Sequence, residues 1–176
     1  STNTEVEAHS EEIVFNADNW KLEQTIVLTS VDDFLKDGDQ TYKISVSTVS
    51  QDEDVKNQNA ESVELTTIDT TKPGFLFSET ALTTYEDQAQ DPATFTIQLT
   101  SIPSSDVNLA LFSSNQNEGT VTPTNVSFNK ENWNVPQTIT VKGIDDDSRD
   151  GNINYTIFFS PSESNDEDYQ GLISNA

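Results

Sequence analysis

Apolar and polar residues alternate along several stretches of the chain. Phe95, Ile97 and Leu99 alternate with threonines and a glutamine, and residues 107–111 and 42–46 show the same period of two. This alternation is typical of a half-buried β-strand, which turns one face toward a core and the other toward water. No stretch longer than one turn has the 3.6-residue period of an amphipathic helix. The pattern therefore predicts an all-β protein.

Short runs rich in Val, Ile, Thr, Phe and Tyr recur along the chain, and clusters of Asn, Asp, Gly, Ser and Pro separate them. The predicted strands are residues 13–15, 25–31, 41–49, 62–68, 75–78, 82–85, 93–100, 107–113, 126–128, 138–144 and 154–160. Many short strands joined by polar turns favour a β-sandwich. The last seven predicted strands match the number in an immunoglobulin-like topology.

One motif occurs twice, at an offset of 113 residues. Residues 15–46 read FNADNWKLEQTIVLTSVDDFLKDGDQTYKISV, and residues 128–159 read FNKENWNVPQTITVKGIDDDSRDGNINYTIFF. Thirteen of the 32 aligned positions are identical. Each copy carries one tryptophan, Trp20 or Trp133, just before a predicted strand, and we expect both rings to cover the end of a core.

An offset of this size matches a whole domain rather than a short solenoid repeat. Strand-like segments precede the second copy within the chain but not the first. We therefore expect Ser1–Thr71 to be the C-terminal part of one module and Lys72–Ala176 to be a nearly complete second module. The predicted fold is all-β, with immunoglobulin-like antiparallel β-sandwich repeats in tandem, the first one truncated. We also expect the chain to be a piece of a longer protein.

Charge narrows the range of partners. Eight basic and 31 acidic residues give a formal net charge of −23, which would repel phosphate backbones and anionic membranes. Nucleic acid is therefore a poor partner, and no apolar run is long enough for direct membrane insertion. A hydrophobic content of 32% raises the possibility of disorder, but the regular alternation argues against it.

Carboxylates cluster in one turn of each copy. Asp145, Asp146 and Asp150 follow a predicted strand of the second copy, and the first copy has aspartates at the matching positions, 32, 33 and 37. Two unit charges about 4 Å apart repel by about 1 kcal/mol in water. Ca²⁺ would relieve this repulsion, because it accepts several carboxylate and carbonyl oxygens in irregular geometry. Zinc is disfavoured because the chain has no cysteine and one histidine. The alternative is a solvated acidic turn that aids solubility.

The second copy resembles the Calx-beta motif modules and related immunoglobulin-like repeats of large extracellular bacterial surface proteins. The resemblance rests on Thr84-Tyr85-Glu86-Asp87 with the strand-like run 93–100, and on Val126-Ser127-Phe128, residues 138–141 and Ile144-Asp145-Asp146-Asp147. It implies an extracellular or cell-surface location and calcium ligands on both copies. The implied ligands are Glu86, Asp145, Asp146 and Asp150 in the second module, and Asp32, Asp33, Asp37 and Asp69 in the first.

These observations predict a non-enzymatic structural or adhesive module, which bound calcium stiffens at acidic turns near the module junctions. Its partners would be the neighbouring repeat modules of the same protein. One alternative is a recognition module that binds a surface glycan or a protein receptor through its loops. Others are a strand-exchanged fibre subunit and a calcium sensor. An enzyme is disfavoured because His9 is the single histidine and no nucleophile motif is present.

Overall fold

The fold consists of β-strands joined by turns and loops. The computed structural model describes residues 6–8, 12–56, 58, 61–87, 89–145 and 151–173. In these ranges all the regular elements are strands, none is a helix, and every strand pairing is antiparallel. The all-β class predicted from the alternation is confirmed. The same ranges contain no helix with the length and apolar character needed to cross a bilayer.

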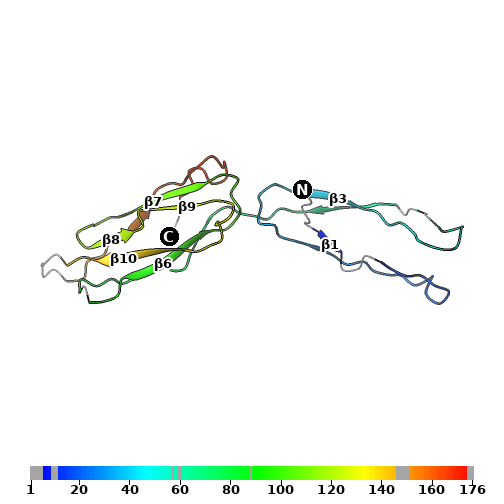
Figure 1. Ribbon diagram of the computed structural model, residues 1–176, viewed down its shortest axis with the longest axis horizontal. Coiled ribbons are helices and arrows are strands. Elements are labelled where there is room, and N and C mark those ends of the chain that lie inside the picture. Colours follow the sequence, from blue (N-terminus) through cyan, green and yellow to red (C-terminus); the bar gives the residue numbers. More distant parts are fainter. Residues whose placement is uncertain are drawn as a thin grey trace. The chain divides into compact units, whose positions relative to one another are not determined.

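The chain folds into two compact units (Figure 1). The first comprises Ser1–Asp33 and Asp37–Thr70, and the second comprises Phe34–Lys36 and Thr71–Ala176. The second unit thus includes three residues that lie, in sequence, within the acidic turn of the first motif copy. The chain consequently passes from one unit to the other three times, after Asp33, after Lys36 and after Thr70.

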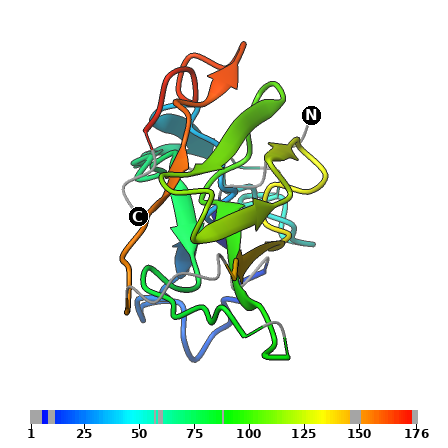
Figure 2. The same ribbon diagram turned by 90° about the vertical axis from the view of Figure 1, so that its left-hand side faces the viewer.

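The second unit contains two antiparallel sheets, seen from two directions in Figures 1 and 2. One has the strand order β5-β6-β10-β8, and in the other β7 pairs with β11, β12 and β9. The strands are β5 (Phe75–Phe77), β6 (Ala93–Leu99), β7 (Val107–Ser113), β8 (Gly119–Thr122), β9 (Asn125–Phe128), β10 (Gln137–Gly143), β11 (Ile157–Phe159) and β12 (Glu163–Ser164).

The alternating sequence of these strands builds one core between the two sheets. In β6 the side chains of Phe95, Ile97 and Leu99 are buried, whereas the intervening polar residues are not. The other members of the core cluster come from both sheets: Val107, Leu109, Leu111, Val121, Val126, Phe128, Ile139, Val141 and Tyr169. Burial of such alternate apolar positions drives the two layers together. The arrangement is consistent with a β-sandwich.

The described part of the first unit has four short strands in two two-stranded sheets. They are β1 (Val6–Ala8) paired with β2 (Leu28–Ser30), and β3 (Gln40–Ile44) paired with β4 (Val63–Thr67). None of its described residues is fully buried. Trp20 is 63% exposed, so the prediction that its ring covers the end of a core is wrong. Trp133 does pack against the core of the second unit, as predicted.

The backbone of the first unit repeats part of the second at the offset seen in the sequence. Val6 pairs with Ser30 in the first unit, and Gly119 pairs with Gly143 in the second, each residue shifted by 113. The turn that contains Asn16 and the turn that contains Asn129 also share five side-chain hydrogen bonds between matching atoms. The repetition therefore extends to residues 6–8, where the two sequences have no similarity.

The repetition also continues past the aligned sequence. Ser50-Gln51-Asp52-Glu53-Asp54 and Ser164-Asn165-Asp166-Glu167-Asp168 form the same turn at an offset of 114. In each, the serine hydroxyl accepts a hydrogen bond from the N–H of the first aspartate, and that carboxylate accepts one from the N–H of the second aspartate. All four N···O distances are 2.9 or 3.0 Å.

Five predicted strands differ from the structure by three residues or more; among them, 41–49 is Gln40–Ile44 and 154–160 is Ile157–Phe159. Residues 13–15 and 82–85 form no strand, and the strand expected at 25–31 is only Leu28–Ser30. In the second unit the positions matching 13–15 pair with β7, and those matching 24–28 pair with β6. Within the described part of the first unit β2 pairs with β1 alone, so the strand is limited to the residues that β1 reaches. Strands β1, β8 and β12 were not predicted.

Candidate functional site

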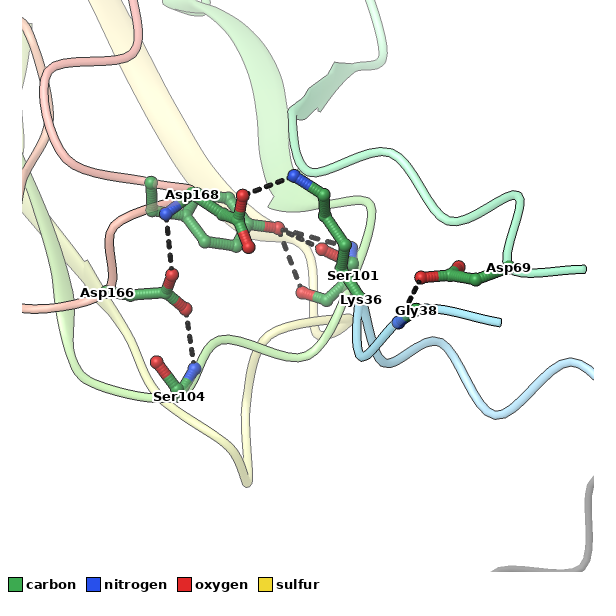
Figure 3. Close-up of polar contacts among 8 residues, drawn as sticks. Lys36, Gly38, Asp69, Ser101, Ser104, Asp166 and Asp168 are labelled. Carbon is green, nitrogen blue, oxygen red and sulfur yellow. Dashed lines mark hydrogen bonds and ion pairs between the residues drawn. The ribbon is translucent and has the colours of Figure 1, made fainter. Parts of the chain in front are cut away.

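The acidic turn of the first copy is held by backbone hydrogen bonds to carboxylates (Figure 3). The N–H of Gly38 donates to Oδ2 of Asp69 at 2.9 Å, as Figure 3 shows. The N–H of Asp69 in turn donates to Oδ1 of Asp39 at 3.0 Å. Gly38 has a φ of 86°, a conformation that glycine adopts without strain. The structure therefore brings the Asp69 carboxylate against the turn that contains Gly38.

A segment of three residues separates the other two aspartates predicted for this turn from Asp37 in the sequence. Asp32 and Asp33 belong to the first unit and precede Phe34–Lys36, which belongs to the second. The side chain of Asp32 is exposed and that of Asp33 is half-buried. Asp32 and Asp33 are only five and four residues before Asp37, and this short spacing predicted one shared turn. The three residues between Asp33 and Asp37, however, are folded with the second unit.

In the second unit, Glu86 and Asp145 lie on segments that touch. A Cβ added to Gly143 would overlap the carbonyl oxygen of Tyr85, so the backbone before Glu86 packs directly on the strand that leads to Asp145. The N–H of Ile144 donates to the carbonyl oxygen of Glu118 at 3.0 Å. Three acidic residues thus lie on neighbouring segments at this edge. Asp146 and Asp150 lie outside the described residues.

The described carboxylates do not by themselves assemble a metal centre. Across these ranges no group of three or more His, Cys, Asp or Glu side chains is placed to hold one ion. In the first unit a backbone N–H already donates to the Asp69 carboxylate, which stabilises its charge without a metal. In the second, the described acids would need Asp146 and Asp150 to complete the implied ligand set.

A second polar site involves the tripeptide Phe34–Lys36, here called the clip. The Phe34 ring packs on Trp133, with 5.3 Å between the ring centroids, and the Phe34 carbonyl accepts a hydrogen bond from the N–H of Ile102 at 2.9 Å. Lys36 forms an ion pair with Asp168 (Figure 3). Phe34 has a φ of 60°, which is unfavourable for a bulky side chain. Packing against the second unit holds this strained conformation.

The carboxylate that pairs with the clip is positioned by a buried neighbour, Asp166. Its Oδ2 accepts from the N–H of Ser104 at 2.6 Å and its Oδ1 from the N–H of Asp168 at 2.9 Å. Burial raises the pKa of Asp166, but the hydrogen bonds from Ser104, Asp168 and Tyr169 outweigh it and leave the pKa below its usual value. Asp166 therefore stays ionised and ties two loops together.

The same loop is anchored in the core by Tyr169. Its hydroxyl donates to the carbonyl oxygen of Ser101 at 2.9 Å and lies 2.8 Å from the Ser101 hydroxyl. The ring is 1% exposed and makes an edge contact with Phe75. A polar side chain buried this deeply needs such partners. The Asp166–Tyr169 turn is therefore a rigid platform for the Asp168 carboxylate.

Sequence reasoning missed both the clip and this turn. The clip has no local signal, because Phe34-Leu35-Lys36 aligns with Asp147-Ser148-Arg149 of the second copy and shares only its basic residue. The turn had a usable signal, since Ser-x-Asp-Glu-Asp occurs at residues 50–54 and again at 164–168. A shift of one residue relative to the main repeat kept it out of the alignment.

Comparison with known proteins identifies no relative. No protein-family model matches the chain, and no curated protein and no solved structure matches it. The resemblance to Calx-beta modules therefore rests on the residues quoted above.

Proposed function

We propose that the chain is a structural, tandem β-sandwich segment of a long extracellular repeat protein, with immunoglobulin-like modules whose partners are the neighbouring modules. The observation that carries this proposal is the repetition of backbone pairing and turn hydrogen bonds at offsets of 113 and 114 residues. Two segments with diverged side chains but the same pairing register are expected from duplication of a folding unit.

The second unit has the properties of a load-bearing module. Its buried apolar residues form one cluster that both sheets share, and its ladders are antiparallel, with seven-residue strands at the centre. Separating such strands requires many backbone hydrogen bonds to break together. The clip comes from the first copy of the motif but folds with the second unit. Such sharing of residues suits an array in which successive repeats stabilise one another.

Pulling on the two ends of the full chain tests the mechanical role. Unfolding of the second unit is expected as one discrete event that adds roughly 350 Å of contour length, at about 3.4 Å for each residue released. The first unit, without a buried residue among those described, is expected to extend without a resolved event. Gradual extension of the whole chain with no discrete step would contradict the proposal.

Calcium binding is the second part of the proposal. It is supported by the contact between the segments that carry Glu86 and Asp145 and by the approach of Asp69 to the turn at Asp37. A site that binds only the folded state would add about 2.7 kcal/mol when free Ca²⁺ exceeds its Kd a hundredfold. Calorimetry on the chain and on an Asp145→Ala, Asp146→Ala variant is the test. Equal heats from both proteins would exclude a site at Asp145 and Asp146, and no heat from the chain at millimolar Ca²⁺ would remove calcium from the function.

A further inference from the structure

One loop of the first unit repeats the loop of the second unit that contains the Asp166–Tyr169 platform. The two loops are residues 48–58, of which 57 lies outside the described residues, and 162–172. In each, the first residue, Thr48 or Ser162, donates to the carbonyl oxygen of the last residue, from its N–H at 2.9 Å and from its hydroxyl at 3.2 Å. Three further backbone hydrogen bonds in each loop join matching residues. The first unit therefore contains a second platform, which its own local hydrogen bonds form.

Both side chains that hold the clip in the second unit have matches in the first unit. The match of Asp168 is Asp54, which is exposed and has no cationic partner among the described residues. The match of Trp133 is Trp20, on the turn whose side-chain hydrogen bonds repeat those of the second copy. Trp20 is 63% exposed, and no aromatic ring in the described part of the chain packs on it. Trp20 and Asp54 are here called the first receptor, and Trp133 and Asp168 the second receptor.

The second receptor shows which kind of segment such a pair binds. Its occupant is the clip, in which an aromatic ring packs on the tryptophan and a basic residue two positions later pairs with the aspartate. The clip belongs to the copy of the motif that precedes its receptor, since Lys36 lies 132 residues before Asp168. The same relation places the occupant of the first receptor in the repeat before the first unit. Three consecutive acidic residues, 52–54, also favour a basic side chain there.

We propose that Trp20 and Asp54 bind a clip-like segment of the preceding repeat, through an aromatic residue on Trp20 and a basic residue two positions later on Asp54. The inference deepens the proposed function and rests on it, because the occupant is a neighbouring repeat of the same protein. Each repeat then passes a short segment to the next one, and these segments hold the array together in addition to its linkers.

The small size of the clip favours an occupant in the same polypeptide. Three residues, with one ring contact, one backbone hydrogen bond and one exposed ion pair, provide too little binding free energy to offset the loss of translational freedom on association. A segment of the same chain is held at a high effective concentration and avoids most of that loss. We therefore expect no binding between separate molecules at micromolar protein.

The test is a chain in which a second copy of residues 1–113, here called the added copy, precedes the full chain. Because its length equals the offset of the repeat, the added copy places a clip before Trp20 at the sequence separation that Phe34 has from Trp133. Phenylalanine replaces Trp133 and the Trp20 of the added copy, so all tryptophan emission comes from the Trp20 of the full chain. We expect acrylamide to quench this emission about threefold less than in the full chain alone with the same Trp133→Phe change, because a packed ring excludes the quencher.

Changes in the added clip separate clip binding from folding of the added copy. Phe34→Ala in the added copy should raise the quenching of Trp20 by about twofold, because the ring that covers it is lost. The same substitution in the clip of the full chain is the matched control and should leave Trp20 unchanged, since that clip packs on position 133. Lys36→Glu in the added copy should also raise the quenching, and Asp54→Lys in that background should reverse the rise, because the two charges are exchanged.

Quenching of Trp20 that does not respond to Phe34→Ala in the added copy would overturn the inference, provided that slowed hydrogen exchange in β2 shows the joined unit to be folded. An unprotected β2 would overturn it as well, because the first receptor would then not accept a repeat of this sequence. Quenching that falls with the concentration of the full chain alone would make a second molecule the occupant. A discrete unfolding step of the second unit under force would still support the modular function, so the two proposals can fail separately.

Discussion

Asp166 is a single residue whose ionisation should govern the acid stability of the second unit. Its pKa is lowered in the fold, because several hydrogen bonds to the carboxylate outweigh the effect of burial. A lowered pKa contributes stability that is fully present above the unfolded value, about 3.9, and is lost as the pH falls through the folded value. We therefore expect the free energy of unfolding to drop as the pH is lowered below about 4.

Replacing this residue separates its contribution from general acid effects. Asp166→Asn should cost about 1–3 kcal/mol at pH 7, because an amide oxygen replaces a carboxylate facing two N–H groups. The variant should also lose less stability than the wild type between pH 5 and 3, measured by chemical denaturation. Asp91→Asn, at an exposed position, is the matched control. Equal acid sensitivity in the variant and the wild type would contradict this role.

Gly143 is required by the close approach of another backbone. A Cβ at this position would overlap the carbonyl oxygen of Tyr85, and backbone cannot move aside as a flexible side chain can. Gly143→Ala should lower the free energy of unfolding by about 1–3 kcal/mol, as overpacking does elsewhere. Gly74→Ala is the control, since its Cβ would meet only the Thr100 hydroxyl, at 3.3 Å. Denaturant midpoints that shift equally in both variants would disprove the steric argument.

Residue patterns predicted the core well and the polar sites only in part. Phe95, Ile97 and Leu99 are buried as their alternation required, because burial of one strand face is a local and repeated signal. Asp69 accepts a hydrogen bond from Gly38, but the calcium ligand set that the resemblance implied stays a prediction. The platform at Asp166 depends on contacts with Ser104, 62 residues away, and no local pattern encodes such a contact.

At the scale of elements, the clip shows how far a short segment can depend on a distant fold. Phe34–Lys36 forms no strand, and its placement depends on a ring contact, one backbone hydrogen bond and an exposed ion pair. The ion pair is about 40% exposed on average, at 47% and 37%, so it adds little stability. Packing of Phe34 on Trp133 is the larger contribution, about 0.5–1.5 kcal/mol beyond area burial.

Two substitutions at Phe34 separate packing from backbone strain. Phe34→Ala loses the ring contact and keeps a side chain at a φ of 60°, whereas Phe34→Gly loses the ring and removes the strain. We expect alanine to lower the free energy of unfolding by about 1–2 kcal/mol and glycine to be about 1 kcal/mol less harmful. Trp133 emission in a Trp20→Phe background reports the transition. If alanine is tolerated better than glycine, the strained conformation is absent in solution.

The sequence predicted the length of a strand well where that strand pairs with another strand on each side. The prediction of 138–144 is close to the observed Gln137–Gly143, which lies between β6 and β8. The equivalent prediction of 25–31 gave only three paired residues, because β1 is the one neighbour of β2 among the described strands. The sequence carries the tendency to be extended, but the length of a strand is decided by the neighbours that accept its hydrogen bonds.

At the scale of the whole molecule, the buried apolar residues are concentrated in one unit. Among the described residues, the core cluster and every other fully buried side chain lie between Phe95 and Tyr169. The first unit exposes large apolar residues that include Val14, Phe15 and Leu22. Because hydrophobic burial is the dominant stabilising contribution in folding, the two units should differ widely in stability.

Hydrogen exchange of the chain alone measures this difference directly. Amides of β6, β7 and β10 should exchange only through global unfolding of the second unit, since they lie in ladders over the core. Amides of β2 and β3 should exchange at least about a hundredfold faster, through local opening of two-stranded sheets that cover no buried residue. The N–H of Gly38, which donates to Asp69, should follow the faster group because both residues belong to the first unit. Equal protection of the two groups at micromolar protein would mean that the first unit has a stability that its described contacts do not account for.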